Sequence, residues 1–411
     1  MVILLFVGYA ACYFCRADLA VSTPLLIDEL GRHGITHAEA VVRIGGISSL
    51  GVLAYALGKL FLGGLGDFWG GRRNFLIGVG GATVFTMLFA LGGGLPLFTL
   101  AWAGLIKISG KWFDHIHHGS IVGILSLSYL IGDAAARPAM GQLLAHGMSW
   151  RAVFYFAASV AGIAFLANAL LLRESRTSAG FTDPSANPLN LYGDGSGERF
   201  SVRALLAPLA RSRAFLTVCL LSFGCTIVRE TFNNWTPEYF TDFLGHSASR
   251  AASLSAIFPA VGAVSVLACG ALSDRLGTNG RPLILFSGLV ASAFGLLLLM
   301  TVPAGMKDSW LPLLAIGLIA LCLLGPYSFL GGAFALDFGG KRAGAAASGI
   351  IDGIGYLGGT LAGDTVARIS QTFGWHSAFL ALAGCCALSA AAAGYLYALS
   401  AAPRLVHRPA S

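Results

Sequence analysis

The stretch GLGDFWGGRR occupies residues 64–73, and a related stretch, GALSDRLGTNGR, occupies residues 270–281. Both come directly after a long apolar segment. Each copy contains an aspartate followed by basic residues: Asp67, Arg72 and Arg73 in the first copy, and Asp274, Arg275 and Arg281 in the second. Because the motif occurs once in each half of the sequence, it predicts a chain built from two homologous halves.

Other stretches repeat at the same spacing. Arg16 is followed by a Thr-Pro pair at residues 23–24, and Arg229 is followed by a Thr-Pro pair at residues 236–237, at the same offset. Gly119 precedes the stretch WRAVF by 31 residues, and Gly344 precedes the stretch WHSAF by 31 residues. Many secondary transporters are built from such repeats, with the substrate site between them near the middle of the bilayer.

The composition excludes a soluble enzyme. Of the 411 residues, 56% are hydrophobic and 11% are charged, and the mean hydropathy is +0.76. A soluble domain carries roughly 25% charged residues. Lipid must therefore be the solvent for most of this chain. The sequence contains no nucleophile–base set, no nucleotide-binding loop and no metal-ligand spacing, so we expect no enzymatic activity, no cofactor, no metal and no ATP-driven pump.

Apolar segments of membrane-spanning length predict an all-α membrane protein with twelve transmembrane helices. We place them at residues 3–28, 42–65, 75–93, 95–113, 119–144, 151–172, 214–241, 250–272, 282–302, 310–335, 344–369 and 376–400. The third and fourth segments are cramped, so the fourth helix is expected to be short. The first run carries Arg16 in its middle and is too long for a signal peptide, although it begins so abruptly that a short leader is expected to precede it.

Basic residues set the expected orientation. A polar segment at residues 173–213 separates an N-terminal half, residues 1–172, from a C-terminal half, residues 214–411. With this linker in the cytoplasm, about fifteen basic residues lie on the inner side and about six on the outer side, as the positive-inside rule requires. The sequence therefore predicts a multi-pass protein of the cell (inner) membrane with both termini in the cytoplasm. The net charge of +7 is assigned to these loops, not to nucleic-acid binding.

The two loop motifs resemble the cytoplasmic loop motif of the major facilitator superfamily. Several stretches resemble, more narrowly, the organophosphate:phosphate antiporter family, which includes glycerol-3-phosphate and hexose-phosphate transporters. These stretches are GYAACYFCR at residues 8–16, RES at 173–175, NWTPEY at 234–239 and KRAGAAASG at 341–349. The resemblance implies two pseudo-symmetric six-helix halves, alternating access and the exchange of an organophosphate for phosphate.

The loop motifs are interpreted as a conformational latch. In each copy the aspartate, Asp67 or Asp274, can hold an arginine and a helix N-terminus. The basic partners are Arg72, Arg73, Arg275 and Arg281. Such contacts would stabilise one of two conformations of the carrier.

Arg16 and Arg229 occupy equivalent positions deep in the first and seventh predicted helices. An arginine inside the membrane is costly, and it marks a functional site by default. A guanidinium group donates a planar fork of hydrogen bonds that matches phosphate oxygens. The pair therefore predicts a phosphate clamp, and the resemblance places the family's phosphate-binding arginines here. In the alternative, Glu230 or Asp133 neutralises each arginine, which only holds helices together.

The resemblance implies further substrate-binding residues. Lys59 matches a lysine that adds positive charge to the family's site, although a lysine at this depth can also extend to the membrane surface. Aromatic positions of the family are matched by Tyr9, Tyr13, Tyr55 and Tyr356. Tyrosine hydroxyl groups in a cavity can orient a sugar or a glycerol moiety. Taken singly, each tyrosine can instead serve in packing.

The chain also departs from the family pattern. Tyr129 stands where the family's phosphate transporters typically carry histidine, and the fourth segment lacks the usual Trp-Pro stretch. Carboxylates near an anion site repel phosphate unless they are paired or protonated. We therefore name Asp133, Glu230 and Asp352 as candidates for proton coupling, and Tyr129 as a substrate-binding residue.

The sequence favours a monomeric secondary carrier that exchanges a small organophosphate for inorganic phosphate. Two alternatives remain open at this point. One is a proton-coupled carrier of another organic anion, and the other is a membrane sensor that binds sugar phosphate without transporting it. A requirement for a pH gradient would identify the first, and binding without flux would identify the second.

Overall fold

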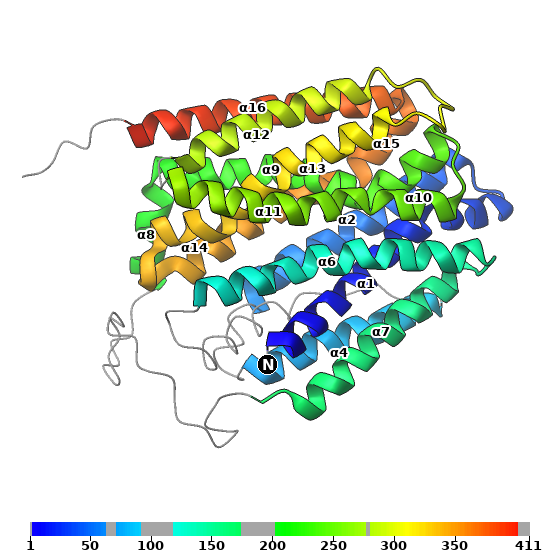
Figure 1. The fold of residues 1–411 in the computed structure, drawn as a ribbon, viewed down its shortest axis with the longest axis horizontal. Helices are drawn as coiled ribbons and strands as arrows, with labels where there is room; N and C mark the ends of the chain where they lie inside the picture. The colour runs from blue at the N-terminus through cyan, green and yellow to red at the C-terminus, as the bar shows by residue number, and fades with distance from the viewer. Residues whose placement is uncertain (1, 63–70, 92–117, 174–201, 277–279, 402–411) are drawn as a thin grey trace, which may run out of the picture.

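The computed structural model describes residues 2–62, 71–91, 118–173, 202–276 and 280–401, and this part of the chain is helical without strands (Figure 1). Its helices are α1 (Val2–Arg32), α2 (His37–Leu62), α4 (Gly71–Ala90), α6 (His118–Ala145), α7 (Trp150–Leu171), α8 (Val202–Arg211), α9 (Arg213–Glu238), α10 (Ala248–Ser255), α11 (Ile257–Leu276), α12 (Gly280–Leu299), α13 (Leu311–Phe329), α14 (Ala335–Gly359), α15 (Asp364–Phe373) and α16 (Trp375–Ala401).

Eight helical segments in the described residues are long and apolar enough to cross a membrane. Large apolar side chains such as Leu170 and Leu388 point outward, with 81% and 77% of their surface exposed. Apolar side chains on the outside suit a surface that faces lipid. Eleven of the twelve predicted spans coincide with described helices, whereas the fourth, residues 95–113, lies outside the described residues.

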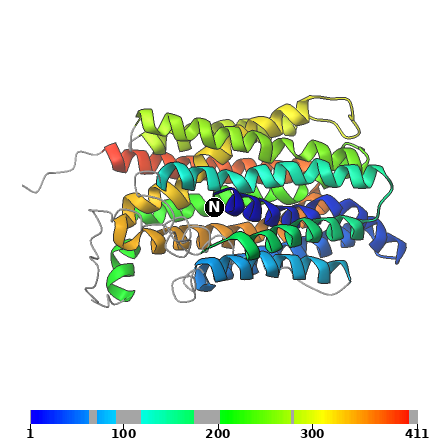
Figure 2. The ribbon, with the colours of Figure 1, turned by 60° about the horizontal axis from the view of Figure 1, so that its bottom comes forward.

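The helices form two groups that run side by side along the long axis of the molecule (Figures 1 and 2). In the N-terminal group, α1 packs against α6 and α7, and α7 packs against α4. In the C-terminal group, α9 packs against α14 and α16, while α12 packs against α13 and α16. Glycine permits the closest approaches: a Cβ added at Gly132 of α6 would lie 2.5 Å from the carbonyl oxygen of Ala10 in α1.

In the described residues, the contact between the two groups involves three N-terminal helices, α1, α2 and α6. α1 contacts α9, α2 contacts α14 and α15, and α6 contacts α10 and α11. At the α2–α15 contact the backbones nearly touch, because a Cβ added at Gly363 would lie 2.4 Å from the carbonyl oxygen of Gly45. The hydroxyl group of Ser49 donates to the Thr360 carbonyl oxygen (2.5 Å) and accepts from the Asp364 amide (2.8 Å).

Two predicted spans are broken in the structure. The span at residues 344–369 divides into α14, a 3₁₀ turn at Thr360–Ala362 and α15, with Gly363 at the break. The span at residues 250–272 divides into α10 and α11 around Ala256, because the ring of Pro259 is incompatible with a continuous helix through Ser255. Both breaks lie at the contact between the two groups.

A short helix occupies the end of the predicted linker. α8 contacts α14 and α9, and its Leu209 is buried in the same apolar cluster as α9. The polar composition of residues 173–213 did not predict this helix. Residues 174–201 lie outside the described part of the chain.

Candidate functional site

Two arginines and a glutamate meet where α1 contacts α9. Nη2 of Arg16 donates to both carboxylate oxygens of Glu230, at 2.8 and 2.7 Å. Nη2 of Arg229 lies 3.5 Å from Oε1 of the same carboxylate, and Asn233 donates to it at 3.4 Å. The Glu230 side chain is fully buried. A carboxylate anion therefore lies between the two guanidinium groups that the sequence predicts as a clamp.

Arg229 is held by tyrosine hydroxyl groups as well. Its Nη1 donates to the hydroxyl oxygens of Tyr327 on α13 (3.0 Å) and Tyr356 on α14 (3.1 Å). Only 4% of the Arg229 side chain is exposed, compared with 20% for Arg16. Tyr327 was missed by the sequence analysis, because its approach to Arg229 depends on how α13 packs against α9.

Aromatic rings surround both guanidinium groups. Arg16 lies 5.6 Å from the ring centre of Tyr13, 5.1 Å from that of Tyr55 and 5.9 Å from that of Tyr356. Arg229 lies 5.8 Å from Tyr129, 5.0 Å from Tyr327 and 5.6 Å from Tyr356. Such contacts stabilise a buried cation through the negative face of the ring. Tyr9 packs on Tyr13, with ring centres 5.5 Å apart.

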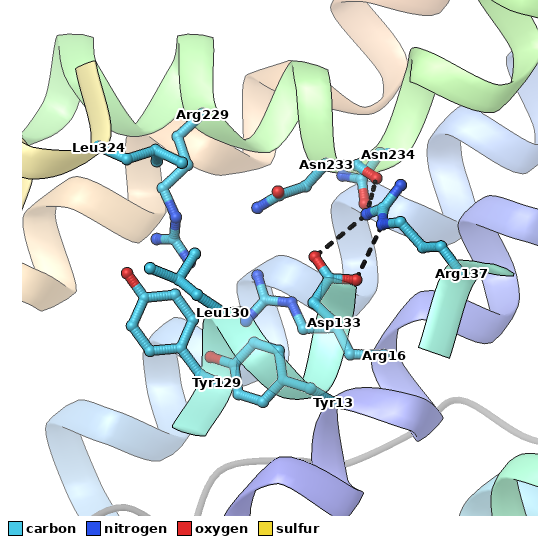
Figure 3. A pocket seen from close by; sticks show the side chains of 10 residues that line it. All are labelled: Tyr13, Arg16, Tyr129, Leu130, Asp133, Arg137, Arg229, Asn233, Asn234 and Leu324. Carbon is cyan, nitrogen blue, oxygen red and sulfur yellow. Dashed lines mark hydrogen bonds and ion pairs between the residues drawn. The ribbon is translucent and has the colours of Figure 1, made fainter. Parts of the chain in front are cut away.

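Within the described part of the chain, two cavities adjoin the arginines, and Arg16 and Asn234 line both. A cavity of about 360 Å³ is lined by side chains that include Arg16, Arg229, Tyr129 and Asp133 (Figure 3). A second cavity, of about 570 Å³, lies between α1, α2 and α9, and its lining includes Arg16, Tyr55 and Glu230. The clamp therefore borders both cavities.

A third buried arginine lies beside the clamp. Arg137 pairs with Asp133 one turn earlier on α6, at 2.9 and 3.2 Å (Figure 3). It also donates to the hydroxyl group of Ser255 on α10 and to the Asn233 carbonyl oxygen on α9. Asp133 is therefore occupied by Arg137, and the carboxylate beside Arg16 is Glu230. The sequence analysis missed Arg137, although a charged residue four positions after Asp133 in an apolar span was a usable signal.

The sequence matches the Major Facilitator Superfamily over residues 5–363. The chain belongs to this superfamily. Similar proteins include a probable hexose phosphate transport protein of Chlamydia trachomatis serovar D, which is 25% identical over 93% of this chain and 87% of its own length. The glycerol-3-phosphate transporter of Bacillus subtilis strain 168 is 22% identical over 94% and 89% of the two chains.

The membrane sensor protein UhpC of Escherichia coli K12 is also similar, at 22% identity over 94% of this chain and 89% of its own. These relatives confirm the predicted resemblance to the organophosphate:phosphate antiporter family. Among solved structures, a D-xylose-proton symporter superposes with a TM-score of 0.75 at 14% identity, covering 95% of this chain and 96% of the symporter. This likeness shows the superfamily fold.

In this superfamily member, two basic residues of the loop motifs, Arg72 and Arg281, contact their own helix group. Arg72 donates to the carbonyl oxygens of Leu172 (2.6 Å) and Ala169 (2.5 Å) at the end of α7. Arg281 donates to Ser273 and pairs with Asp337 at the start of α14. Arg73 and Arg275 are exposed. Asp67 and the Asp274 side chain lie outside the described part of the structure, so the predicted latch stays a prediction.

Two further predicted residues are placed incompletely. Lys59 lies within α2, but its side chain is not among those described. Asp352 of α14 is half-buried and packs against the turn at Leu330–Phe334, where a Cβ added at Gly331 would meet its Oδ1 at 2.4 Å. Asp352 does not line either cavity described above.

Among the described residues, one cluster of potential metal ligands lies at the contact between the two helix groups. Nε2 of His37, at the start of α2, lies 3.3 Å from Oδ1 of Asp242 and 3.8 Å from Oε1 of Glu238. Glu238 is the last residue of α9, and Asp242 follows that helix. Their ligand atoms lie within 4.8 Å of one another. Trp375 donates to the other oxygen of Asp242. The sequence analysis did not single out this group.

Proposed function

We propose that this chain is a secondary carrier that binds a phosphorylated organic anion between Arg16 and Arg229 and exchanges it for inorganic phosphate. The observation that carries the proposal is the Glu230 carboxylate, which already lies between the two guanidinium groups. A place that holds one anion between two arginines from different helix groups is suited to a second anion of higher charge. The similarity to hexose-phosphate and glycerol-3-phosphate transporters supports phosphate as that anion.

Phosphate competes with Glu230 for the arginines. A phosphate dianion carries twice the charge of a carboxylate and offers more acceptor oxygens to the guanidinium forks. In the proposed binding step, Arg16 releases Glu230 and turns to the phosphate, while Arg229 stays fixed by Tyr327 and Tyr356. The organic moiety then extends toward the cavities beside the clamp. The hydroxyl groups of Tyr55 and Tyr129 can orient a sugar or a glycerol there.

Alternating access requires the two halves of the chain to move relative to each other. We place the halves at residues 1–172 and 214–411, joined by the linker at 173–213, and the substrate site on their contact. Arg16 belongs to the first half and Arg229 to the second, so a bound anion contacts both. We propose a monomer in the cell (inner) membrane with both termini in the cytoplasm. A cysteine introduced at Gly193 should then react only with reagents that reach the cytoplasm, and labelling from outside would contradict this orientation.

Uptake into proteoliposomes tests the proposal. Vesicles with and without internal unlabelled phosphate are given labelled phosphate, and then the same label in competition with hexose 6-phosphate, glycerol 3-phosphate and a carboxylate. We expect strong stimulation by internal phosphate and competition by the phosphate esters but not by the carboxylate. Binding of these esters without uptake would contradict transport and would identify a sensor.

The Arg16–Glu230 ion pair favours a second candidate function, proton-coupled net uptake. Two unpaired arginines in an empty low-dielectric site would hinder the return of the empty carrier. Because Glu230 neutralises Arg16 when no ligand is bound, the empty carrier can change conformation at a lower cost. Equal uptake into phosphate-free vesicles, driven by an acidic exterior, would establish this mode in place of exchange.

A further inference from the structure

One carboxylate beside the clamp has an oxygen to which no described residue donates a hydrogen bond. Asp18 of α1 lines the cavity of about 570 Å³ together with Arg16 and Glu230. Only 2% of Asp18 is exposed. Its Oδ1 accepts a hydrogen bond from the Leu19 amide at 2.6 Å, whereas its Oδ2 is buried and has no hydrogen-bond partner among the described residues. The sequence analysis did not single out Asp18.

Among the residues that the structure describes, the surroundings of Asp18 offer no cation to this oxygen. The titratable side chains that line the same cavity are Cys15 and Arg16 of α1, Tyr55 of α2 and Glu230 of α9. Arg16 is turned toward Glu230, and the Asp133–Arg137 pair of α6 faces the neighbouring cavity. The described parts of α4, α7 and α10 add no charged side chain to the lining.

The three buried carboxylates near the clamp thus differ in their partners. Glu230 is paired with Arg16, and Asp133 is paired with Arg137. In both pairs a guanidinium group lies against the carboxylate and compensates its charge. An ionised carboxylate without a partner in a low-dielectric interior is costly, and it takes up a proton instead. A proton also needs no additional room, which suits an oxygen that no solvent molecule reaches.

We propose that Asp18 is a proton-binding site in the substrate cavity, and that its proton binds together with the anion. The proposal rests on the anion binding at Arg16 and Arg229. Protonation converts the Asp18 carboxylate to a neutral carboxyl group, and no other bond changes. The proton then crosses the membrane with the anion, whether the carrier works by exchange or by net uptake.

Proton and anion binding are linked because Asp18 and Arg16 line one cavity. An ionised Asp18 repels an incoming phosphate and weakens the positive field of Arg16, whereas a protonated Asp18 does neither. By reciprocity, a bound anion favours protonation of Asp18 by the same factor. Such couplings typically amount to about 5- to 150-fold in affinity.

The test compares phosphate binding to wild-type protein and to Asp18→Asn between about pH 6 and pH 9. Asparagine has the shape of the protonated acid and cannot ionise. Phosphate itself titrates in this range, so the difference between the two proteins at each pH isolates Asp18. Asp28→Asn, an exposed position ten residues further along the same helix, is the matched control.

We expect the affinity of wild-type protein to fall more steeply with rising pH than that of Asp18→Asn, by up to about tenfold per pH unit for one linked proton. At acidic pH the two proteins should bind phosphate equally within about twofold, since Asp18 is then protonated. Asp28→Asn should follow the wild type. In proteoliposomes, Asp18→Asn should retain phosphate transport and lose its stimulation by a pH gradient.

Identical pH dependence in the wild type and in Asp18→Asn would overturn the proposal. Weaker phosphate binding by Asp18→Asn at every pH would also overturn it, since Asp18 would then act as an ionised partner of Arg16. Asp18→Glu keeps a titratable carboxyl group and should keep the slope, and Asp18→Ser supplies a second neutral variant if Asp18→Asn does not fold. A wild-type protein that binds no phosphate would instead refute the anion site itself.

Discussion

At the scale of single residues, the two arginines of the clamp have different supports. Arg229 is nearly buried and is fixed by two tyrosine hydroxyl groups, whereas Arg16 is more exposed and is bound to a single carboxylate. We therefore expect Arg229 to act as the fixed part of the site and Arg16 as the part that changes partner. Glu230 is then an internal competitor that a substrate must displace.

Replacing Glu230 by glutamine tests this competition. The amide oxygen can still accept a hydrogen bond from Arg16 but carries no charge, so phosphate meets less competition, and we expect phosphate affinity to rise by about tenfold. Without ligand, the uncompensated guanidinium should lower the free energy of unfolding by about 3–5 kcal/mol. Binding assays and thermal unfolding with and without phosphate measure both effects.

The control for Glu230→Gln is Glu39→Gln, which breaks the exposed pair between Glu39 and Arg43. An exposed i,i+4 pair contributes only about 0.3–0.5 kcal/mol, so this variant should be close to the wild type in both assays. Unchanged or weaker phosphate binding by Glu230→Gln would show that Glu230 does not compete with the ligand.

Tyr327 and Tyr129 should affect phosphate binding in different ways. Tyr327→Phe removes a hydrogen bond to Arg229 and should weaken phosphate binding by roughly two- to tenfold, equivalent to about 0.5–1.5 kcal/mol. Tyr129 lines the smaller cavity (Figure 3), so Tyr129→Phe should change the ranking among phosphate esters more than the affinity for phosphate itself. Competition assays with both variants measure the two effects. The same ranking in Tyr129→Phe as in the wild type would place this hydroxyl group outside the substrate site.

At the scale of helices, Arg137 connects elements of both groups. It belongs to α6, and it binds the backbone of α9 and Ser255 of α10 in addition to Asp133. Truncating one partner of a buried pair leaves the other charge uncompensated, whereas replacing both with apolar residues is often neutral. The Asp133–Arg137 pair therefore holds α6 against the C-terminal helices.

A double-mutant cycle tests this pair. Arg137→Met alone should lower the free energy of unfolding by about 3–5 kcal/mol, because it leaves the Asp133 carboxylate buried without a partner. The double variant Asp133→Leu with Arg137→Met should recover most of that loss. Thermal unfolding of the purified proteins gives the comparison, and equal losses in the single and the double variant would mean that the two residues do not act as a pair.

The sequence located the helices well because apolar runs of membrane-spanning length are a strong local signal. It did not predict the breaks at Ala256 and Gly363, which lie where one helix group contacts the other. The clamp arginines were found from their depth in apolar spans. The same criterion, applied to every charged residue, would also have found Asp18 and Arg137.

Partnerships between side chains could not be predicted in the same way. Nothing local in the sequence indicates that Arg16 pairs with Glu230 and that Asp133 pairs with Arg137. Which carboxylate each arginine pairs with depends on how α1, α6 and α9 are rotated against one another. For the same reason Tyr327 carried no signal, although it contacts Arg229 as closely as the predicted Tyr356 does.

At the scale of the whole molecule, the contact between α2 and α15 should show whether the two helix groups separate during transport. Ser49 and Asp364 belong to different helix groups and are joined by a hydrogen bond. A disulfide between cysteines at these two positions should hold the groups together on this side of the site. We expect the oxidised Ser49→Cys, Asp364→Cys protein to lose transport and to regain it on reduction. Undiminished transport by the fully cross-linked protein would mean that this contact stays closed throughout the cycle.

The clamp spans the two helix groups, and the proposed function depends on it. Its most direct test is the equilibrium binding of phosphate to purified Arg16→Lys and Arg229→Lys. Lysine keeps the charge and loses the planar fork, so each variant should bind phosphate about ten- to a hundredfold more weakly, a loss of roughly 1.5–3 kcal/mol. Arg43→Lys, in an exposed pair, should bind as the wild type does. Near-normal affinity in either clamp variant, in well-folded protein, would show that the arginines hold helices together and do not bind the substrate.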